Sequence, residues 1–244
     1  MARTCEKLGV RLLIFNDLQH KLDRPITHFE DDGFQFFGLR HEPLQNPLNR
    51  SLKRVIDIVV AVPVCLLVLP VLTAIVWLFQ HLQSPGPIFY RQVRNGFQKQ
   101  RFHIWKFRTM HVNDHDAAQQ ASLNDPRIYR AGRWFRKLSI DEFPQFINVL
   151  KGDMSVVGPR PHLPEHDEQF ARLTDNFYVR KFVKPGITGL AQVNGFRGET
   201  REHSALQHRL EYDIEYLENW SLRADLAIIA QTAVQCVKPP KTAY

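Results

Sequence analysis

The segment KLSIDEFPQFINVLKGDMSVVGPRP, residues 137–161, guides the interpretation of the whole chain. Its apolar residues recur at helical spacing, and Gly152 provides a natural helix end. Pro144 is tolerated in the first turn of a helix but not deep inside one. The sequence therefore predicts a short helix with Asp141 at or next to its N-cap. The free N–H groups and the dipole at such an end attract anions, phosphate included.

The same residues also fit an interpretation without chemistry. Ser139 and Glu142 have the spacing of a capping box, in which the two side chains satisfy backbone N–H groups at the start of a helix. Asp141 and Glu142 would then serve the helix alone. These residues alone do not distinguish a helix cap from an acidic active site, so the rest of the sequence is needed.

Composition points to an anionic partner. The chain has 244 residues, 44% of them apolar, which is enough for one sizeable core. Its net charge is +7 at pH 7, a value that suits anionic lipid or a phosphorylated small molecule. The three cysteines have no metal-ligand spacing. No nucleic-acid reading motif is present, and the basic residues gather beside an apolar segment, so we expect no nucleic-acid partner.

Residues 1–50 look like an appendage. Residues 10–15 read as a buried strand followed by an Asn16-Asp17 turn. Fifty residues with one clear strand are not expected to fold alone. We interpret them as a docking segment or the tail of a larger domain, without catalytic residues.

Residues 55–79 are almost wholly apolar, and Asp57 is their one charged residue. The segment is long enough to cross a bilayer. However, Pro70 lies inside it, and basic residues flank both ends, which keeps both ends on the cytoplasmic side. We therefore predict a re-entrant helix that bends near Pro70. A kinked spanning helix and a buried core helix are the alternatives. Asp57 is expected to pair with Lys53 or Arg54 at the membrane interface.

Residues 80–136 form a basic region. Residues 88–92 and 102–107 are predicted as short strands, with a turn at Asn95-Gly96. Lys106 and Arg108 are two residues apart, so on a strand they would point to one face and suit a diphosphate. The alternative is an ordinary solvated face. Further on, helices are predicted at about residues 202–219 and 222–236, either packed in the core or lying at the membrane interface.

Seven motifs in a fixed order carry a family resemblance. The chain resembles the bacterial polyprenyl-phosphate sugar-1-phosphate transferases, the monotopic phosphoglycosyl transferases of surface-polysaccharide assembly. The resemblance covers roughly residues 50–244. The motifs are KRxxD at 53–57, GPIFYRQ at 86–92, FxxxKFRTM at 102–110, DPR at 125–127, RKLSIDEFPQ at 136–145, GDMSVVGPRP at 152–161 and KPGITGLAQVNG at 184–195.

The resemblance implies transfer of a sugar-1-phosphate from a UDP-sugar donor to undecaprenyl phosphate, with release of UMP. It implies that Asp141 is the nucleophile and that Glu142 helps to bind Mg²⁺. The family's basic positions fall on Lys106, Arg136 and Arg160, and Arg160 is similar to a residue that contacts the nucleotide. Together with Arg108 from the strand argument, these are the expected substrate-binding residues: Lys106, Arg108, Arg136 and Arg160.

The expected fold is α/β of the α+β kind, mostly helical. We expect a remnant of an accessory nucleotide-fold domain at 1–50, a re-entrant membrane helix at 51–82 and a cytosolic catalytic domain with short strands and amphipathic helices at 83–244. The expected location is the cytoplasmic face of the bacterial inner membrane. The family breaks its membrane helix at Ser-Pro, whereas this chain has Leu69-Pro70. A homodimer through the N-terminal segment is compatible with the sequence.

Two other functions compete with the transferase. A membrane-bound phosphohydrolase could use Asp141 and would need no lipid acceptor. A non-enzymatic basic membrane adaptor would tolerate loss of both Asp141 and Glu142.

Overall fold

The computed structural model describes residues 17–23, 26–31, 33–112, 125–174, 176–196 and 203–237. The chain divides into two compact units, residues 1–41 and 42–244. In the first unit the short helix α2 (Leu18–Leu22) precedes an antiparallel hairpin of β1 (Thr27–Asp31) and β2 (Phe34–Gly38). The strand predicted at residues 10–15 lies outside the described residues.

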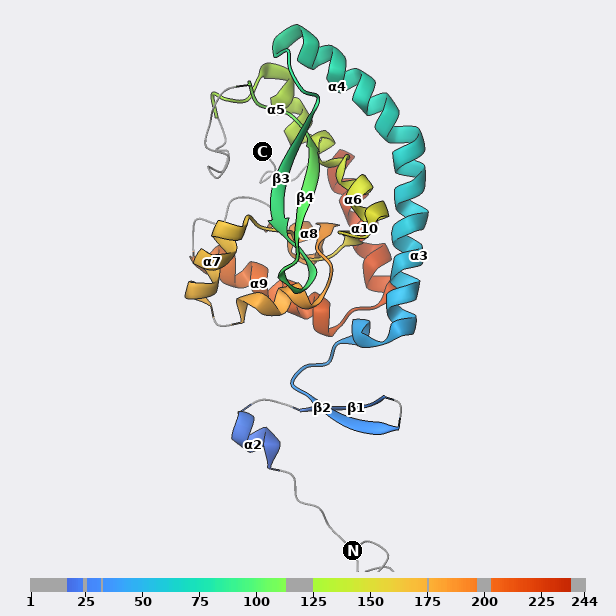
Figure 1. Ribbon diagram of the computed structural model, residues 1–244, viewed down its shortest axis with the longest axis vertical. Coiled ribbons are helices and arrows are strands. Elements are labelled where there is room, and N and C mark those ends of the chain that lie inside the picture. Colours follow the sequence, from blue (N-terminus) through green and yellow to red (C-terminus); the bar gives the residue numbers. More distant parts are fainter. Residues whose placement is uncertain are drawn as a thin grey trace, which may run out of the picture. The chain divides into compact units, whose positions relative to one another are not determined.

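The second unit opens with a long, irregular helical segment. Helix α3 (Pro47–Pro63) begins at Asn46, whose side chain accepts a hydrogen bond from the Leu48 N–H. A single π-helical turn, Val64–Val68, separates α3 from α4 (Leu69–Gln83), and Pro70 lies in the first turn of α4. The irregular turn thus lies just before Pro70. A proline in a helix has no N–H to donate to the carbonyl four residues earlier, and the helix is therefore irregular there. Figure 1 shows α3 and α4 as one long, curved rod.

One face of this rod packs on the protein, and the other is apolar and open. Ala61, Leu69 and Val76 are buried in the core, whereas Leu66 and Leu67 are 69% and 71% exposed. The segment Pro47–Gln83 is long and apolar enough to cross a membrane by length and composition. A buried core helix was one alternative from the sequence, but most of its apolar surface is uncovered, which favours contact with lipid.

Three polar residues of α3 fix the rod to the rest of the unit. The Lys53 ammonium donates to Asp225 Oδ2 at 2.7 Å and to the Tyr216 hydroxyl at 2.9 Å. The Arg54 guanidinium donates to two backbone carbonyls at the end of α6 (Gln145–Lys151). Asp57 accepts hydrogen bonds from the Ser155 hydroxyl and the Val156 N–H, both at 2.8 Å. The expected pairing of Asp57 with Lys53 or Arg54 at the membrane interface is confirmed only as far as the charge of Lys53 acts on Asp57. The interfacial position is wrong, because Asp57 is buried and its hydrogen bonds go to Ser155 and Val156 inside the unit.

The predicted hairpin is confirmed. β3 (Phe89–Asn95) pairs antiparallel with β4 (Arg101–Phe107), and Tyr90 lies opposite Lys106. Asn148 of α6 continues the pairing along β4. Its amide donates to the His103 carbonyl at 2.8 Å and accepts from the Trp105 N–H at 3.0 Å. This fully buried side chain holds α6 against the strand that carries Lys106.

A second pair of strands includes the C-terminal part of the segment 137–161. β5 (Ser155–Val157) runs parallel to β6 (Gly186–Thr188). The two backbones approach so closely that a Cβ atom on Gly186 would lie 2.1 Å from the Gly158 nitrogen. Both positions therefore need glycine.

The core of the second unit contains two apolar clusters. One includes Met154, Trp220 and Ile228, and the other includes Phe107, Tyr129 and Phe135. The predicted mostly helical fold with short strands is confirmed, and so are the two C-terminal helices. The remaining helices are α5 (Arg130–Lys137), α7 (Pro164–Leu173), α8 (Leu190–Val193), α9 (His203–Glu218) and α10 (Leu222–Val237).

Candidate active site

Asp141 and Glu142 lie in a single 3₁₀ turn, Ile140–Glu142, between α5 and α6. α6 begins only at Gln145, with Pro144 immediately before it. The prediction that Asp141 lies at or next to the helix N-cap is therefore wrong, because Pro144 is the N-cap of α6 and Asp141 lies three residues earlier, in the separate 3₁₀ turn. The predicted end is confirmed, since Gly152 adopts a left-handed conformation with φ of 90°.

The capping box is also absent. Ser139 has a left-handed backbone with φ of 60°, and its side chain forms no cap hydrogen bond. Its N–H donates instead to the Arg136 carbonyl at 3.1 Å. The Glu142 side chain is consequently available for contacts with distant parts of the chain.

Glu142 contacts two cations, Lys106 and Arg160. Lys106 Nζ lies 3.2 Å from Glu142 Oε1. Arg160 Nη2 lies 2.6 Å from Oε1, and Arg160 Nη1 lies 3.2 Å from Oε2. β4 supplies the lysine, and the loop after β5 supplies the arginine. The Glu142 side chain is 8% exposed and that of Arg160 is 23% exposed, so the ion pairs lie at the edge of the interior. Such a two-pronged, charge-assisted contact fixes the orientation of the carboxylate.

Asp141 shares this environment. It is 9% exposed, and its charge acts on both Lys106 and Arg160. Burial lowers the pKa of Lys106, although Glu142 partly offsets this effect. Burial also opposes the charge of Arg160, but the ion pair and hydrogen bond with Glu142, together with the charge of Asp141, outweigh it and raise the pKa of Arg160. The site therefore holds two adjacent carboxylates between two cations, an arrangement that can accept a phosphate beside a carboxylate.

Arg108 and Arg136 are placed differently. β4 ends at Phe107, so strand alternation does not extend to Arg108. The Arg108 guanidinium donates to the Ser84 carbonyl and hydroxyl and to the carbonyls of Pro87 and Met110. The structure thus does not bring Lys106 and Arg108 to one face, and Arg108 braces the turn after α4. Arg136 lies half-buried near the end of α5.

Sequence reasoning missed a buried charge network behind Arg160. Arg180 Nη2 donates to the Arg160 carbonyl at 2.7 Å and lies 2.7 Å from Asp213 Oδ2. Lys181 pairs with Asp167 at 2.7 Å. These residues come from the 3₁₀ segment Phe177–Phe182, α7 and α9. No spacing rule links them, because tertiary packing alone makes them neighbours.

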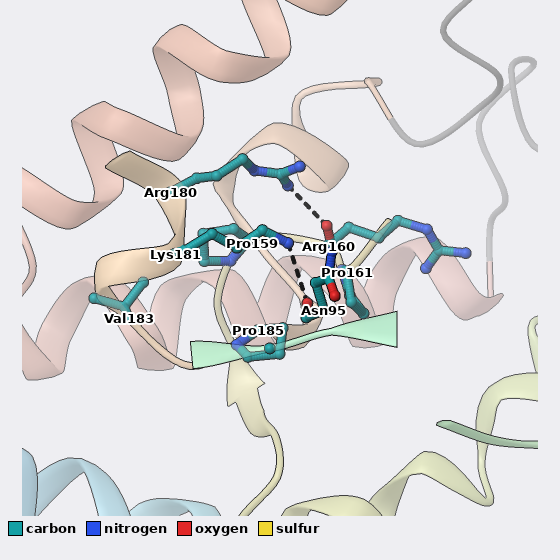
Figure 2. A pocket seen from close by; sticks show the side chains of 9 residues that line it. Asn95, Pro159, Arg160, Pro161, Arg180, Lys181, Val183 and Pro185 are labelled. Atoms are coloured by element: carbon teal, nitrogen blue, oxygen red, sulfur yellow. Dashed lines mark hydrogen bonds between the residues drawn. The ribbon is translucent and has the colours of Figure 1, made fainter. Parts of the chain in front are cut away.

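Figure 2 shows the small cavity beside this network. Arg180 and Lys181 reach across it toward the carbonyls of Arg160 and Asn95. The Arg160 guanidinium points away from the cavity, and Glu142 is not among its lining residues. The cavity therefore lies behind the carboxylate site.

The described residues contain no group of three or more His, Cys, Asp and Glu side chains able to hold a metal. Mg²⁺ does not require such a group, since it often takes one or two carboxylates and completes its shell with substrate phosphate and water. Asp141 and Glu142 are a donor set of this kind. Both Glu142 oxygens contact cations here, and a carboxylate has further lone pairs that could bind a metal.

Comparison with known proteins identifies the class. The family model described as bacterial sugar transferase matches residues 48–239, and the chain belongs to this family. It is 44% identical over 231 residues to the UDP-glucose:undecaprenyl-phosphate glucose-1-phosphate transferase of Escherichia coli K12, covering 94% of this chain and 48% of the relative.

Other relatives carry related names. The chain is 50% identical to the UDP-glucose:undecaprenyl-phosphate glucose-1-phosphate transferase of Xanthomonas campestris, covering 67% of this chain and 34% of the relative. It is 40% identical to a UDP-N-acetylgalactosamine-undecaprenyl-phosphate N-acetylgalactosaminephosphotransferase of Aeromonas hydrophila, covering 78% of this chain and 44% of the relative. The chain thus spans half or less of the length of these three relatives.

Proposed function

We propose that this protein transfers a sugar-1-phosphate from a UDP-sugar to undecaprenyl phosphate and releases UMP. The observation that carries the proposal is the contact of Glu142 with Lys106 and Arg160 directly beside Asp141. The names of the relatives support the donor and acceptor classes, and UDP-glucose is the first donor to test.

In the proposed reaction an Asp141 carboxylate oxygen attacks the phosphorus that bears the sugar. The bond from that phosphorus to the UMP oxygen breaks, and UMP leaves with the electron pair. An acyl-phosphate on Asp141 results. An oxygen of undecaprenyl phosphate then attacks the same phosphorus, the bond to Asp141 breaks, and the lipid diphosphate sugar is formed.

The two cations make this meeting of anions feasible. Lys106 and Arg160 neutralise the repulsion between the Asp141 carboxylate and the diphosphate, and they stabilise the charge that develops on the leaving UMP. Glu142 orients both cations through its ion pairs. We propose that Glu142 also holds Mg²⁺ once substrate phosphate is present, since such an ion would supply further neutralisation of phosphate charge.

We further propose that the α3–α4 rod enters the cytoplasmic leaflet of the bacterial inner membrane and returns to the same side. Its exposed apolar face and the π-helical turn before Pro70 support this arrangement. A catalytic site at the membrane surface would let the acceptor present its phosphate while its tail stays in lipid.

The test measures UMP release from a panel of UDP-sugars by detergent-solubilised protein, with and without undecaprenyl phosphate. Lipid-dependent release with one donor, lost in Asp141→Asn, is the expected result. The exposed α7 residue Glu168 provides the matched control, and Glu168→Gln should keep wild-type rates. Without acceptor, the wild-type protein should gain the mass of one sugar phosphate.

The rival functions give different results. Release of free phosphate or sugar phosphate without lipid would favour the phosphohydrolase. A membrane adaptor would release no UMP with any donor. Undiminished activity in Asp141→Asn would exclude Asp141 as the nucleophile.

A further inference from the structure

Arg209 of α9 is a buried cation with unused donors. The residue is 4% exposed, and its Nε and Nη2 groups have no hydrogen-bond partner among the described residues. Nε of Arg94 and Nε of Arg180 are buried without partners in the same sense. A buried donor left unsatisfied costs about 1–3 kcal/mol, and more when it is charged. Such groups are rare in native proteins and call for an acceptor.

The surroundings of Arg209 are strongly positive. The charges that act on Arg209 include those of Arg94, Arg160 and Arg180 and that of the carboxylate Asp213, which also forms an ion pair with Arg180. Burial, followed by the charge of Arg180, lowers the pKa of Arg209 to about 9. Burial, followed by the charge of Arg160, lowers the pKa of Arg94 to about 10. Glu142 and Asp167 also act on Arg94, but they already form ion pairs with Arg160 and Lys181. Arg209 thus shares Asp213 with Arg180.

The group of arginines is continuous with the carboxylate site. Arg160 contacts Glu142 through its guanidinium and accepts from Arg180 through its carbonyl. Arg94 donates to the Pro161 carbonyl at 3.3 Å, on the same stretch of backbone. The charges of Arg94 and Arg160 act on Arg209, and that of Glu142 acts on Arg94. An anion bound by these arginines would thus lie within the electrostatic reach of the carboxylate site.

We propose that Arg209, together with Arg94 and Arg160, forms a subsite for a phosphate monoester of the reaction. This inference rests on the proposed function, in which two phosphate monoesters use the site in turn: UMP when it leaves and the lipid phosphate when it enters. Guanidinium groups match phosphate oxygens with paired N–H donors. A dianion would satisfy the unused donors and balance the excess positive charge. Arg209 therefore binds the phosphate that is not being transferred.

The experiment measures thermal stabilisation of the full chain in detergent with EDTA, so that no turnover occurs. The probes are inorganic phosphate, UMP, a short-chain polyprenyl phosphate and, as a phosphate-free control, uridine. A phosphate probe should raise the melting midpoint of the wild type, and uridine should not. Arg209→Gln should weaken that binding by about tenfold or more. Arg172→Gln, at an exposed position of α7, is the matched control and should bind as the wild type does.

The choice of probe identifies the source of the phosphate. Stabilisation by UMP alone assigns the subsite to the nucleotide, stabilisation by the lipid phosphate alone assigns it to the acceptor, and stabilisation by both shows a shared subsite. Arg209→Lys keeps the charge but not the paired donors. If both Arg209 variants fail to fold, Arg94→Lys, at a half-buried position, tests the same subsite. No response of the wild type to any phosphate, or equal responses in the folded variants, would overturn the proposal.

Turnover separates this inference from the proposed function. Phosphate binding that depends on Arg209, in a protein that turns over no UDP-sugar, would refute the transferase and leave the subsite standing. Lipid-dependent transfer with unchanged kcat and KM in Arg209→Lys would refute the subsite and leave the transferase standing.

Discussion

Arg160 Nη2 lies 2.6 Å from Glu142 Oε1, although the two residues are 18 positions apart in the chain. The contact joins the turn that carries Asp141 to the loop that follows β5. It also connects the carboxylates with the buried arginines behind them, because the Arg160 carbonyl accepts from Arg180. One residue therefore links the proposed nucleophile to the proposed phosphate subsite.

Replacing Arg160 by lysine tests this link. A lysine ammonium keeps the charge but cannot form the two-pronged contact with Glu142. We expect UMP release to fall by about 100-fold, in the range seen when one donor to a developing charge is lost. The measurement is the steady-state rate with the preferred donor, with Arg172→Lys as control. A rate within about twofold of wild type would show that the paired geometry is unimportant.

Asn148 should be needed for stability as well as for placement of Lys106. Asn148→Ala leaves the His103 carbonyl and the Trp105 N–H of β4 without their partner. Because the site is fully buried, we expect a loss of about 2–4 kcal/mol of unfolding free energy. Thermal unfolding measures it, and Asn219→Ala, at an exposed position, should change little. Equal melting of both variants would contradict the role of Asn148 as a bridge.

Asp57 should anchor the membrane rod to β5. Asp57→Ala removes the acceptor of the Ser155 hydroxyl and the Val156 N–H, both buried. We expect a loss of about 3 kcal/mol of unfolding free energy. Ser51→Ala, on an exposed face of α3, is the control. If Asp57 acted only as an interfacial charge, the two variants would melt alike in detergent.

Lys181 should make stability depend on pH. Burial, with Arg180 nearby, lowers its pKa from 10.5 to about 8. Between these values the unfolded state binds more protons than the folded state, so the unfolding free energy should rise with pH. The expected contribution is up to about 1.4 kcal/mol per pH unit.

The check for Lys181 is unfolding from about pH 7.5 to 9.5, below the range where tyrosines titrate. Lys181→Met should flatten the rise, whereas Lys137→Met, at an exposed position, should leave it unchanged. A rise of the same slope in Lys181→Met would assign the pH dependence to other buried cations.

Local sequence patterns were sufficient to predict several of the helices and strands and the family. Helical periodicity located α9 and α10, the Asn95-Gly96 turn located the β3–β4 hairpin, and Gly152 ended α6 as predicted. These features follow from local rules, since turn geometry and side-chain spacing act over a few residues. Ordered motifs likewise pointed to Asp141 and Glu142 before any contact was known.

The contacts of those residues depend on the folded chain. The Ser139–Glu142 capping box was locally plausible, yet Glu142 contacts Lys106 and Arg160 instead. Arg108 was expected beside Lys106, but the strand ends before it. No sequence pattern pointed to Arg209, because its proposed role depends on arginines from distant segments that surround it in the fold. Burial and long-range charge are properties of the folded chain, and spacing along the sequence cannot reveal them.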